Sequence, residues 1–213
     1  GLLWDQAAAG DKAANAKIQV LTPIVKGWCT DMAVRVASEG VLVHGGMGII
    51  EETGAAQFYS DSCILPIYEG TNAIQSNALL RALTADKGET VKTVIDEYAE
   101  IIARVDYEMP AHEHLSRALN RLREATEWML SQNDMMTLSA VSVAYMQLFG
   151  YTACGVMMAK RLSALETLEG NNGFAGGKKA AILAYMSHVL PTTEGWFYAI
   201  ISGADVITGS DVE

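Results

Sequence analysis

The sequence predicts an all-α protein. Alanine, leucine, methionine and glutamate are abundant among its 213 residues, and only four residues are prolines. Apolar residues recur at spacings of three and four, which is the period of an amphipathic helix. Alternating β-branched runs bounded by hairpin turns, the usual signal for strands, are hard to find. We therefore expect an antiparallel helical bundle followed by a second helical bundle.

The first part of the chain should hold the end of one helix and then a long helix. Residues 1–12 have the pattern of a helix end, and the long helix is expected over about residues 16–43. Pro23 either kinks this helix or marks its first turn. One face of the helix carries Ile18, Leu21, Val25, Trp28, Met32 and Val36. The helix should stop at the glycines Gly45, Gly46 and Gly48.

Two shorter helices should follow. Residues 52–62 are expected to be helical, whereas residues 63–70, CILPIYEG, contain a proline and end in a glycine, which favours a loop. Thr71 is a plausible N-cap for a helix that runs to about Thr84.

A polar, glycine-containing stretch, ADKGET at residues 85–90, separates two parts of the chain whose sequence patterns differ. We place a domain boundary there, with one domain over residues 1–86 and another over residues 90–213. The second domain should be a bundle of roughly five antiparallel helices with short connections. Its helices are expected at 91–105 (closed by residues 109–110), 115–129, 138–156, 178–189 and 191–206, with a glycine-rich loop at 170–177.

Charge and composition exclude several classes of protein. Half of the residues are hydrophobic, so the chain must fold. Twenty-five acidic against fifteen basic side chains give a net charge of −10, which argues against nucleic acid or an anionic lipid surface as a partner.

The cysteines and the hydropathy pattern predict a soluble, cytoplasmic protein. The three cysteines are widely spaced, which suggests neither a disulfide framework nor a zinc site. No run approaches the roughly 18 uninterrupted apolar residues of a membrane span, and no export signal is visible. His112 and His114 lie two residues apart and so point away from each other on a helix, which leaves no metal site to propose.

Two local patterns could carry chemistry. The glycines at 45, 46 and 48 offer bare backbone amides to a phosphate or dinucleotide, although they equally suit a helix cap and turn. Glu69 lies in the apolar loop before the helix that begins after Thr71. Desolvation there would raise the pKa of the carboxylate, as a general base requires. Alternatively, Glu69 only favours the positive end of the helix dipole.

Residues 43–75, VHGGMGIIEETGAAQFYSDSCILPIYEGTNAIQ, resemble the C-terminal helical domain of the acyl-CoA dehydrogenases. The resemblance combines a GGxG block, Asp61 on the next helix, and IYEGT followed by NxIQ. It covers roughly residues 1–85, including the upstream LTPIVKGWCTD. The remainder, about residues 90–213, resembles the extra helical domain of a larger bacterial subgroup that includes methylmercaptopropionyl-CoA dehydrogenases.

The resemblance implies a dehydrogenase site at Glu69. In the family, the matching carboxylate removes the α-proton of an acyl-CoA thioester while the β-hydrogen leaves as hydride to the flavin of FAD. The site must also stabilise the enolate and exclude solvent. Gly70 matches a position against the substrate. Segments that contact FAD in the family match Thr71, Asn72 and Ala73 and, from a neighbouring subunit, Leu42, Val43, His44, Gly45 and Gly46.

The family also implies partners. In the family, a neighbouring subunit completes each flavin-binding site, so the resemblance predicts a homo-oligomer, either a dimer or a tetramer. Electron-transfer flavoprotein or a similar acceptor should take the electrons. His44 is equally well explained as a cofactor contact or as a helix-end residue. The chain departs from the family pattern at Leu42, Gln57, Ser60, Cys63 and Ala73, so dinucleotide contacts should be weaker or made by the backbone.

Family members hold flavin and substrate between this helical domain, an N-terminal helical domain and a β domain. This chain has no β domain, so we expect it to be a fragment that by itself neither binds FAD tightly nor turns over. The alternative is a non-catalytic oligomerisation or docking module with a vestigial site. A desolvated Glu69 that faces a cavity would favour the enzyme, and an exposed Glu69 would favour the module.

Overall fold

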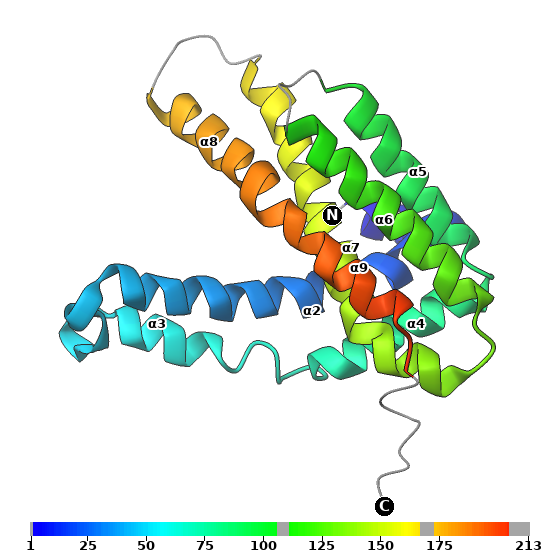
Figure 1. Cartoon of the computed structure of the whole chain (residues 1–213), viewed down its shortest axis with the longest axis horizontal. Coiled ribbons are helices and arrows are strands. Elements are labelled where there is room, and N and C mark those ends of the chain that lie inside the picture. Colours follow the sequence, from blue (N-terminus) through cyan, green and yellow to red (C-terminus); the bar gives the residue numbers. More distant parts are fainter. Residues whose placement is uncertain (1, 106–110, 167–172, 205–213) are drawn as a thin grey trace, which may run out of the picture.

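A computed structural model describes residues 2–105, 111–166 and 173–204, and Figure 1 shows their arrangement. Within these residues every regular element is helical and no strand is present, which confirms the predicted all-α fold. The expected helix end at residues 109–110 and the first part of the glycine-rich loop, residues 170–172, lie outside the described residues.

The first two helices are α1, Leu2–Ala8, and α2, Lys12–Val43. Asp11 begins α2 as its N-cap, because its carboxylate accepts hydrogen bonds from the backbone amides of Ala13 and Ala14 at 2.8 and 3.1 Å. The predicted long helix is confirmed, and it starts earlier than expected. Pro23 lies inside it rather than in its first turn.

Two 3₁₀ turns, Gly45–Ile49 and Glu51–Thr53, follow α2 and lead to α3, Ala55–Ser62. The helix predicted at 52–62 is therefore shorter than expected, since Gly54 takes a left-handed conformation (φ 75°) that separates the turn from α3. After the loop, α4 runs over Asn72–Ala85 with Thr71 at its N-cap position, as predicted.

The remaining helices form a bundle: α5 (Glu89–Ala103), α6 (Ala111–Ser131), α7 (Met135–Glu166), α8 (Gly173–Ala184) and α9 (Thr193–Ile201). A π turn, Tyr185–Val189, and a 3₁₀ turn, Leu190–Thr192, join α8 to α9. Figure 1 shows α8 and α9 following one another along a single line rather than folding back.

The prediction of a glycine-rich loop is wrong for residues 173–177, which form the first turns of α8. Glycine costs about 1 kcal/mol relative to alanine in a helix, so its frequency favoured a loop. A local contact supports the helix instead: the Lys178 ammonium lies 5.4 Å from the centre of the Phe174 ring, four residues earlier.

Helix α7 is the centre of the molecule. It packs against α2, α4, α5, α6 and α9. One hydrophobic core, which includes Leu79, Leu83, Ile95, Leu122 and Phe149, is continuous across the break at residues 85–90. Of the described helices, α7 alone is long and apolar enough to cross a membrane, but 67% of its apolar window is buried among the other helices, as in the core helix of a bundle.

The second half of α2, the 3₁₀ turns, α3 and the loop after it project from this bundle (Figure 1). We call residues 36–71 the arm. Among the described residues, twenty-two large apolar side chains are exposed, and eleven of them lie in the arm: Val36, Leu42, Val43, Met47, Ile49, Ile50, Phe58, Tyr59, Ile64, Ile67 and Tyr68. The arm thus presents an apolar surface that the other described residues do not cover.

Candidate functional site

The loop that carries Glu69 turns the chain from the arm into α4. Glu69 and Gly70 are both left-handed, with φ of 54° and 89°. A residue with a side chain takes this conformation at a cost of roughly 1–2 kcal/mol, whereas glycine takes it readily. A Cβ at Gly70 would also lie 3.3 Å from the side-chain amide of Gln75. The turn itself therefore explains a glycine at position 70.

The desolvation expected for Glu69 is not found among the described residues. Glu69 is exposed, and the apolar residues that should cover it, Ile64, Ile67 and Tyr68, are themselves 54%, 59% and 48% exposed. The reason is that no described element packs over the loop. Any group that desolvates the carboxylate must come from outside the described residues.

Polar contacts hold the backbone of the loop on α2 and α4. The Lys26 ammonium donates to the carbonyl oxygen of Gly70 at 2.6 Å, and the Gln75 side-chain amide donates to the carbonyl oxygen of Glu69 at 3.1 Å. No hydrogen bond or ion pair joins the Glu69 carboxylate itself to the described residues. A fixed backbone therefore presents a free carboxylate.

Asn72, the first residue of α4, is turned into the protein. Its side-chain oxygen accepts from Lys26 at 3.2 Å and from the Thr30 hydroxyl at 3.3 Å. Its side-chain nitrogen donates to the carbonyl oxygen of Gly27 at 3.0 Å and to the Asp31 carboxylate at 2.5 Å. All four bonds are made within this chain, so only its backbone is left for a cofactor. Thr71 and Ala73, by contrast, are exposed.

Asp31 links this network to the bundle. Its second carboxylate oxygen accepts a hydrogen bond of 2.6 Å from the side-chain amide of Gln147, a residue of α7 that is 6% exposed. Sequence reasoning missed Lys26, Asp31 and Gln147. The available signals were the polar positions in LTPIVKGWCTD and the lone glutamine among apolar residues in AYMQLFG.

Two close helix contacts place α7 beside α2 at this point. A Cβ at Gly27 would lie 2.4 Å from the sulfur of Met146, and a Cβ at Gly150 would lie 2.1 Å from the ring of Trp28. The glycines therefore allow the helices to approach closely. The side chain of Gln147 reaches Asp31 because it lies between these two contacts on α7.

The glycine block lies at the tip of the arm, at the other end of α3 from Glu69 (Figure 1). Leu42 and Val43 are 68% and 85% exposed, and a Cβ at Gly46 would meet nothing within 4 Å. The Nδ1 atom of His44 lies 2.8 Å from the carbonyl oxygen of Gly40, so this histidine closes the end of α2. The structure does not bring residues 42–46 to the Glu69 loop.

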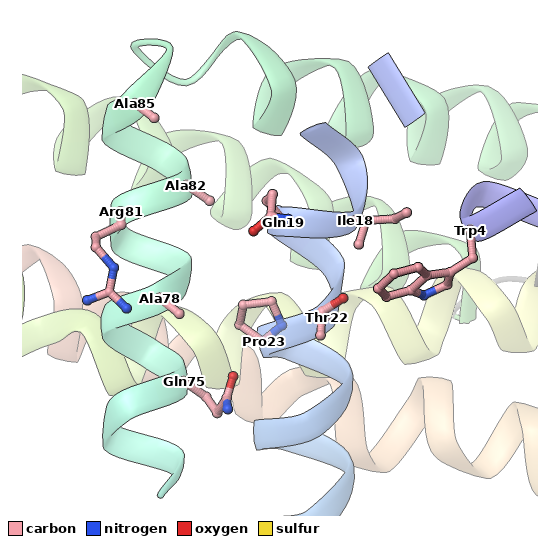
Figure 2. A pocket seen from close by; sticks show the side chains of 10 residues that line it. All are labelled: Trp4, Ile18, Gln19, Thr22, Pro23, Gln75, Ala78, Arg81, Ala82 and Ala85. Carbon is pink, nitrogen blue, oxygen red and sulfur yellow. The ribbon is translucent and has the colours of Figure 1, made fainter. Parts of the chain in front are cut away.

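A hollow of about 480 Å³ is lined by residues of α2 and α4 and by Trp4 of α1 (Figure 2). Ala78, Ala82 and Ala85 line it from α4, and Gln19 and Pro23 from α2. Its lining contains no carboxylate, and Glu69 is not part of it. In the described part of the chain, no three histidine, cysteine or acidic side chains gather as a metal site.

Comparison with known proteins shows that two parts of this chain match two protein families. Residues 2–84 match the family described as "Acyl-CoA dehydrogenase, C-terminal domain", and residues 88–211 match the family described as "Acetyl-CoA dehydrogenase C-terminal like".

Similar curated proteins carry related names. A 3-methylmercaptopropionyl-CoA dehydrogenase of Ruegeria pomeroyi is 43% identical over 76% of this chain and 29% of its own length. A butyryl-CoA dehydrogenase of Syntrophomonas wolfei is 28% identical over 85% of this chain and 32% of its own length. The short-chain specific acyl-CoA dehydrogenase of Megasphaera elsdenii is 40% identical over 35% of this chain and 20% of its own length. The chain thus spans about three-tenths of the first two relatives.

Proposed function

The chain belongs to the acyl-CoA dehydrogenase family, and we propose that it is the C-terminal part of an enzyme that dehydrogenates an acyl-CoA thioester between its α and β carbons, with Glu69 as the general base. The observation that carries this proposal is the free carboxylate of Glu69 on a backbone held by Lys26 and Gln75. A general base must lie within hydrogen-bond reach of the proton that it removes, so its backbone has to be held in place.

The exposure of Glu69 fits this proposal if other parts of the enzyme cover the loop. A carboxylate in water is too weak a base for an α-proton, so the substrate and further protein must exclude solvent and stabilise the enolate. The apolar surface of the arm, with Ile67 59% and Tyr68 48% exposed, suits such a cover. Gly70, next to the base, would lie against the acyl-CoA.

The residues of this chain that match FAD-binding segments of the family would contact FAD from one side only. The exposed Thr71 hydroxyl caps nothing in α4, and the open backbone at Gly46 leaves room for a close approach. We propose that Thr71, the backbone of Asn72 and Ala73 hold one flavin, and that Leu42, Val43, His44, Gly45 and Gly46 reach another in a homo-oligomer. FAD, when bound, supplies the hydride acceptor for the β-hydrogen. Reduced enzyme would pass electrons to electron-transfer flavoprotein or a similar acceptor.

The second candidate is a non-catalytic oligomerisation or docking module. Two observations favour it: Glu69 is exposed, and the arm carries an uncovered apolar surface. In that case the IYEGT motif would be vestigial, and the arm would serve assembly alone.

Flavin bleaching in the full-length protein separates the two candidates. The protein is mixed without oxygen with a panel of acyl-CoAs that includes butyryl-CoA and 3-methylmercaptopropionyl-CoA, and the visible spectrum is followed. Glu69→Gln should retain bound flavin and slow bleaching by about 100-fold or more, which is the usual contribution of a general base. Glu52→Gln, which changes an exposed carboxylate of the arm, should bleach at the wild-type rate.

Two results would contradict the enzyme proposal. One is a full-length protein that holds no flavin, and the other is Glu69→Gln bleaching as fast as wild type. Either result would favour the assembly module. The isolated chain should be colourless and inactive in both cases, because its contacts to FAD come from one side only.

A further inference from the structure

A series of hydrogen-bonded side chains connects the loop of Glu69 to the second helical region, residues 88–204. Two successive left-handed residues, Glu69 and Gly70, form its turn. Because Glu69 is not a glycine, its left-handed conformation is held by the contacts of the turn rather than by its own preference. The carbonyl of Gly70 is fixed by the Lys26 ammonium at 2.6 Å, so the position of that ammonium sets the position of the turn.

Asn72 sets the position of Lys26. Its side-chain oxygen is the second acceptor of the Lys26 ammonium, at 3.2 Å. The amide can face only one way, because its oxygen side meets the Lys26 ammonium, which can only donate, while its nitrogen side meets the Gly27 carbonyl and the Asp31 carboxylate, which can only accept. A side chain with both ends satisfied has a single orientation.

Asp31 in turn orients Asn72, and Gln147 orients Asp31. One carboxylate oxygen of Asp31 accepts from Asn72 at 2.5 Å, and the other accepts from Gln147 at 2.6 Å. Hydrogen bonds to a carboxylate are shorter and stronger than those between neutral groups. Gln147 is 6% exposed and lies on the central helix α7, so it anchors this series of hydrogen bonds in the packed core.

We propose that Asp31, held by Gln147 of α7, is a positioning residue that fixes the backbone of Glu69 through Asn72 and Lys26. The second helical region then has a role in the dehydrogenation: it supports the turn that carries the base. This inference rests on the proposed function. It assigns no chemical step to Asp31, Asn72, Lys26 or Gln147.

The test uses a swap of the two partners in the full-length protein. Gln147→Glu places two carboxylates against each other, whereas Asp31→Asn/Gln147→Glu restores both bonds: the new amide at position 31 donates to the new carboxylate at position 147, and its oxygen still accepts from Asn72. We expect kcat for acyl-CoA oxidation to fall about 10-fold or more in Gln147→Glu, with KM within about twofold, because a small displacement of a catalytic group slows the reaction strongly. The double variant should recover to within about threefold of wild type.

Two further variants separate positioning from stability. Gln147→Leu removes the bond without adding a charge and should also lower kcat. Ser142→Ala removes a different buried hydrogen bond between α7 and α4, the 3.0 Å contact with Ser76, and should leave kcat unchanged. Melting temperature and flavin content are measured for every variant. Hydrogen exchange of the amides of residues 69–73 should rise in both Gln147 variants and return to the wild-type rate in the double variant.

The inference is overturned if Gln147→Glu and Gln147→Leu keep wild-type kcat while Glu69→Gln is inactive. It is also overturned if the double variant is no better than Gln147→Glu. If Glu69→Gln itself turns over at the wild-type rate, the proposed function fails and this inference fails with it, so the two failures are distinguished by the same set of proteins.

Discussion

The bundle and the arm use apolar residues in opposite ways. In the bundle, Leu115, Leu122 and Phe149 are each 0% exposed, whereas in the arm Phe58 is 73% and Val43 is 85% exposed. Apolar side chains stabilise a protein by about 25 cal/mol for each Å² removed from water. The apolar side chains of the bundle therefore stabilise this fold, whereas those of the arm, which the other described residues leave exposed, contribute little until they are covered.

The largest expected difference between the two regions is in the effect of truncating a side chain. Leu122→Ala should lower the free energy of unfolding of this chain by about 2–5 kcal/mol, because it leaves a cavity in the core. Phe58→Ala removes a larger side chain from the arm but should change that free energy by less than about 0.5 kcal/mol. Urea titrations of both variants measure the difference. Equal losses would show that the arm is packed within this chain.

Adding a methyl group should give the next largest difference. Gly150→Ala places a Cβ 2.1 Å from the ring of Trp28, where α7 packs on α2. We expect a loss of roughly 1–3 kcal/mol from overpacking, read from the urea midpoint. Gly46→Ala in the arm is the matched control, since a Cβ there meets nothing within 4 Å. A Gly150→Ala variant as stable as wild type would mean that α2 and α7 do not approach this closely.

The smallest effect concerns the junction between α4 and α5, at Asp86. Partial burial raises the pKa of its carboxyl, but hydrogen bonds from the Thr90 hydroxyl and the Thr90 and Gly88 amides outweigh this and leave the pKa below its usual value. The resulting stability is present above the unfolded-state pKa of about 3.9 and is lost as the pH falls through the folded-state pKa.

Asp86→Asn should therefore be less stable than wild type near neutral pH, and the gap should shrink in acid. Urea midpoints measured at about pH 6 and about pH 3 give this comparison. A gap that keeps its size or grows as the pH falls would contradict the role of the ionised carboxylate. It would leave the junction held by the helices alone.

Helix positions in the bundle could be predicted from sequence because local patterns determine them. The stripe Val91, Val94, Ile95, Tyr98 and Ile102 lies at helical spacing, and all five residues are buried in α5. The first turns of α8 could not be predicted in the same way, since their glycines favour a loop and only the contact between Phe174 and Lys178 favours a helix.

The candidate site was less predictable because its parts are distant in sequence. Glu69 and its motif stand out locally, but Asp31 and Gln147 lie 116 residues apart, and only the packing of α7 on α2 brings them together. Of the two explanations considered for Glu69, desolvation by its neighbours in sequence is not found among the described residues, because Ile67 and Tyr68 do not fold over it. Local apolar sequence indicates that a surface will be covered, and not which part of the protein covers it.

We expect parts of the protein beyond this chain to cover the loop of Glu69. Hydrogen–deuterium exchange in the full-length protein and in the isolated chain tests it most directly. Amides of residues 63–71 should exchange slowly in the full-length protein and quickly in the isolated chain, while those of α6 and α7 exchange slowly in both. Equally fast exchange at residues 63–71 in the full-length protein would contradict the claim, because Glu69 would then remain in water and could not act as the base.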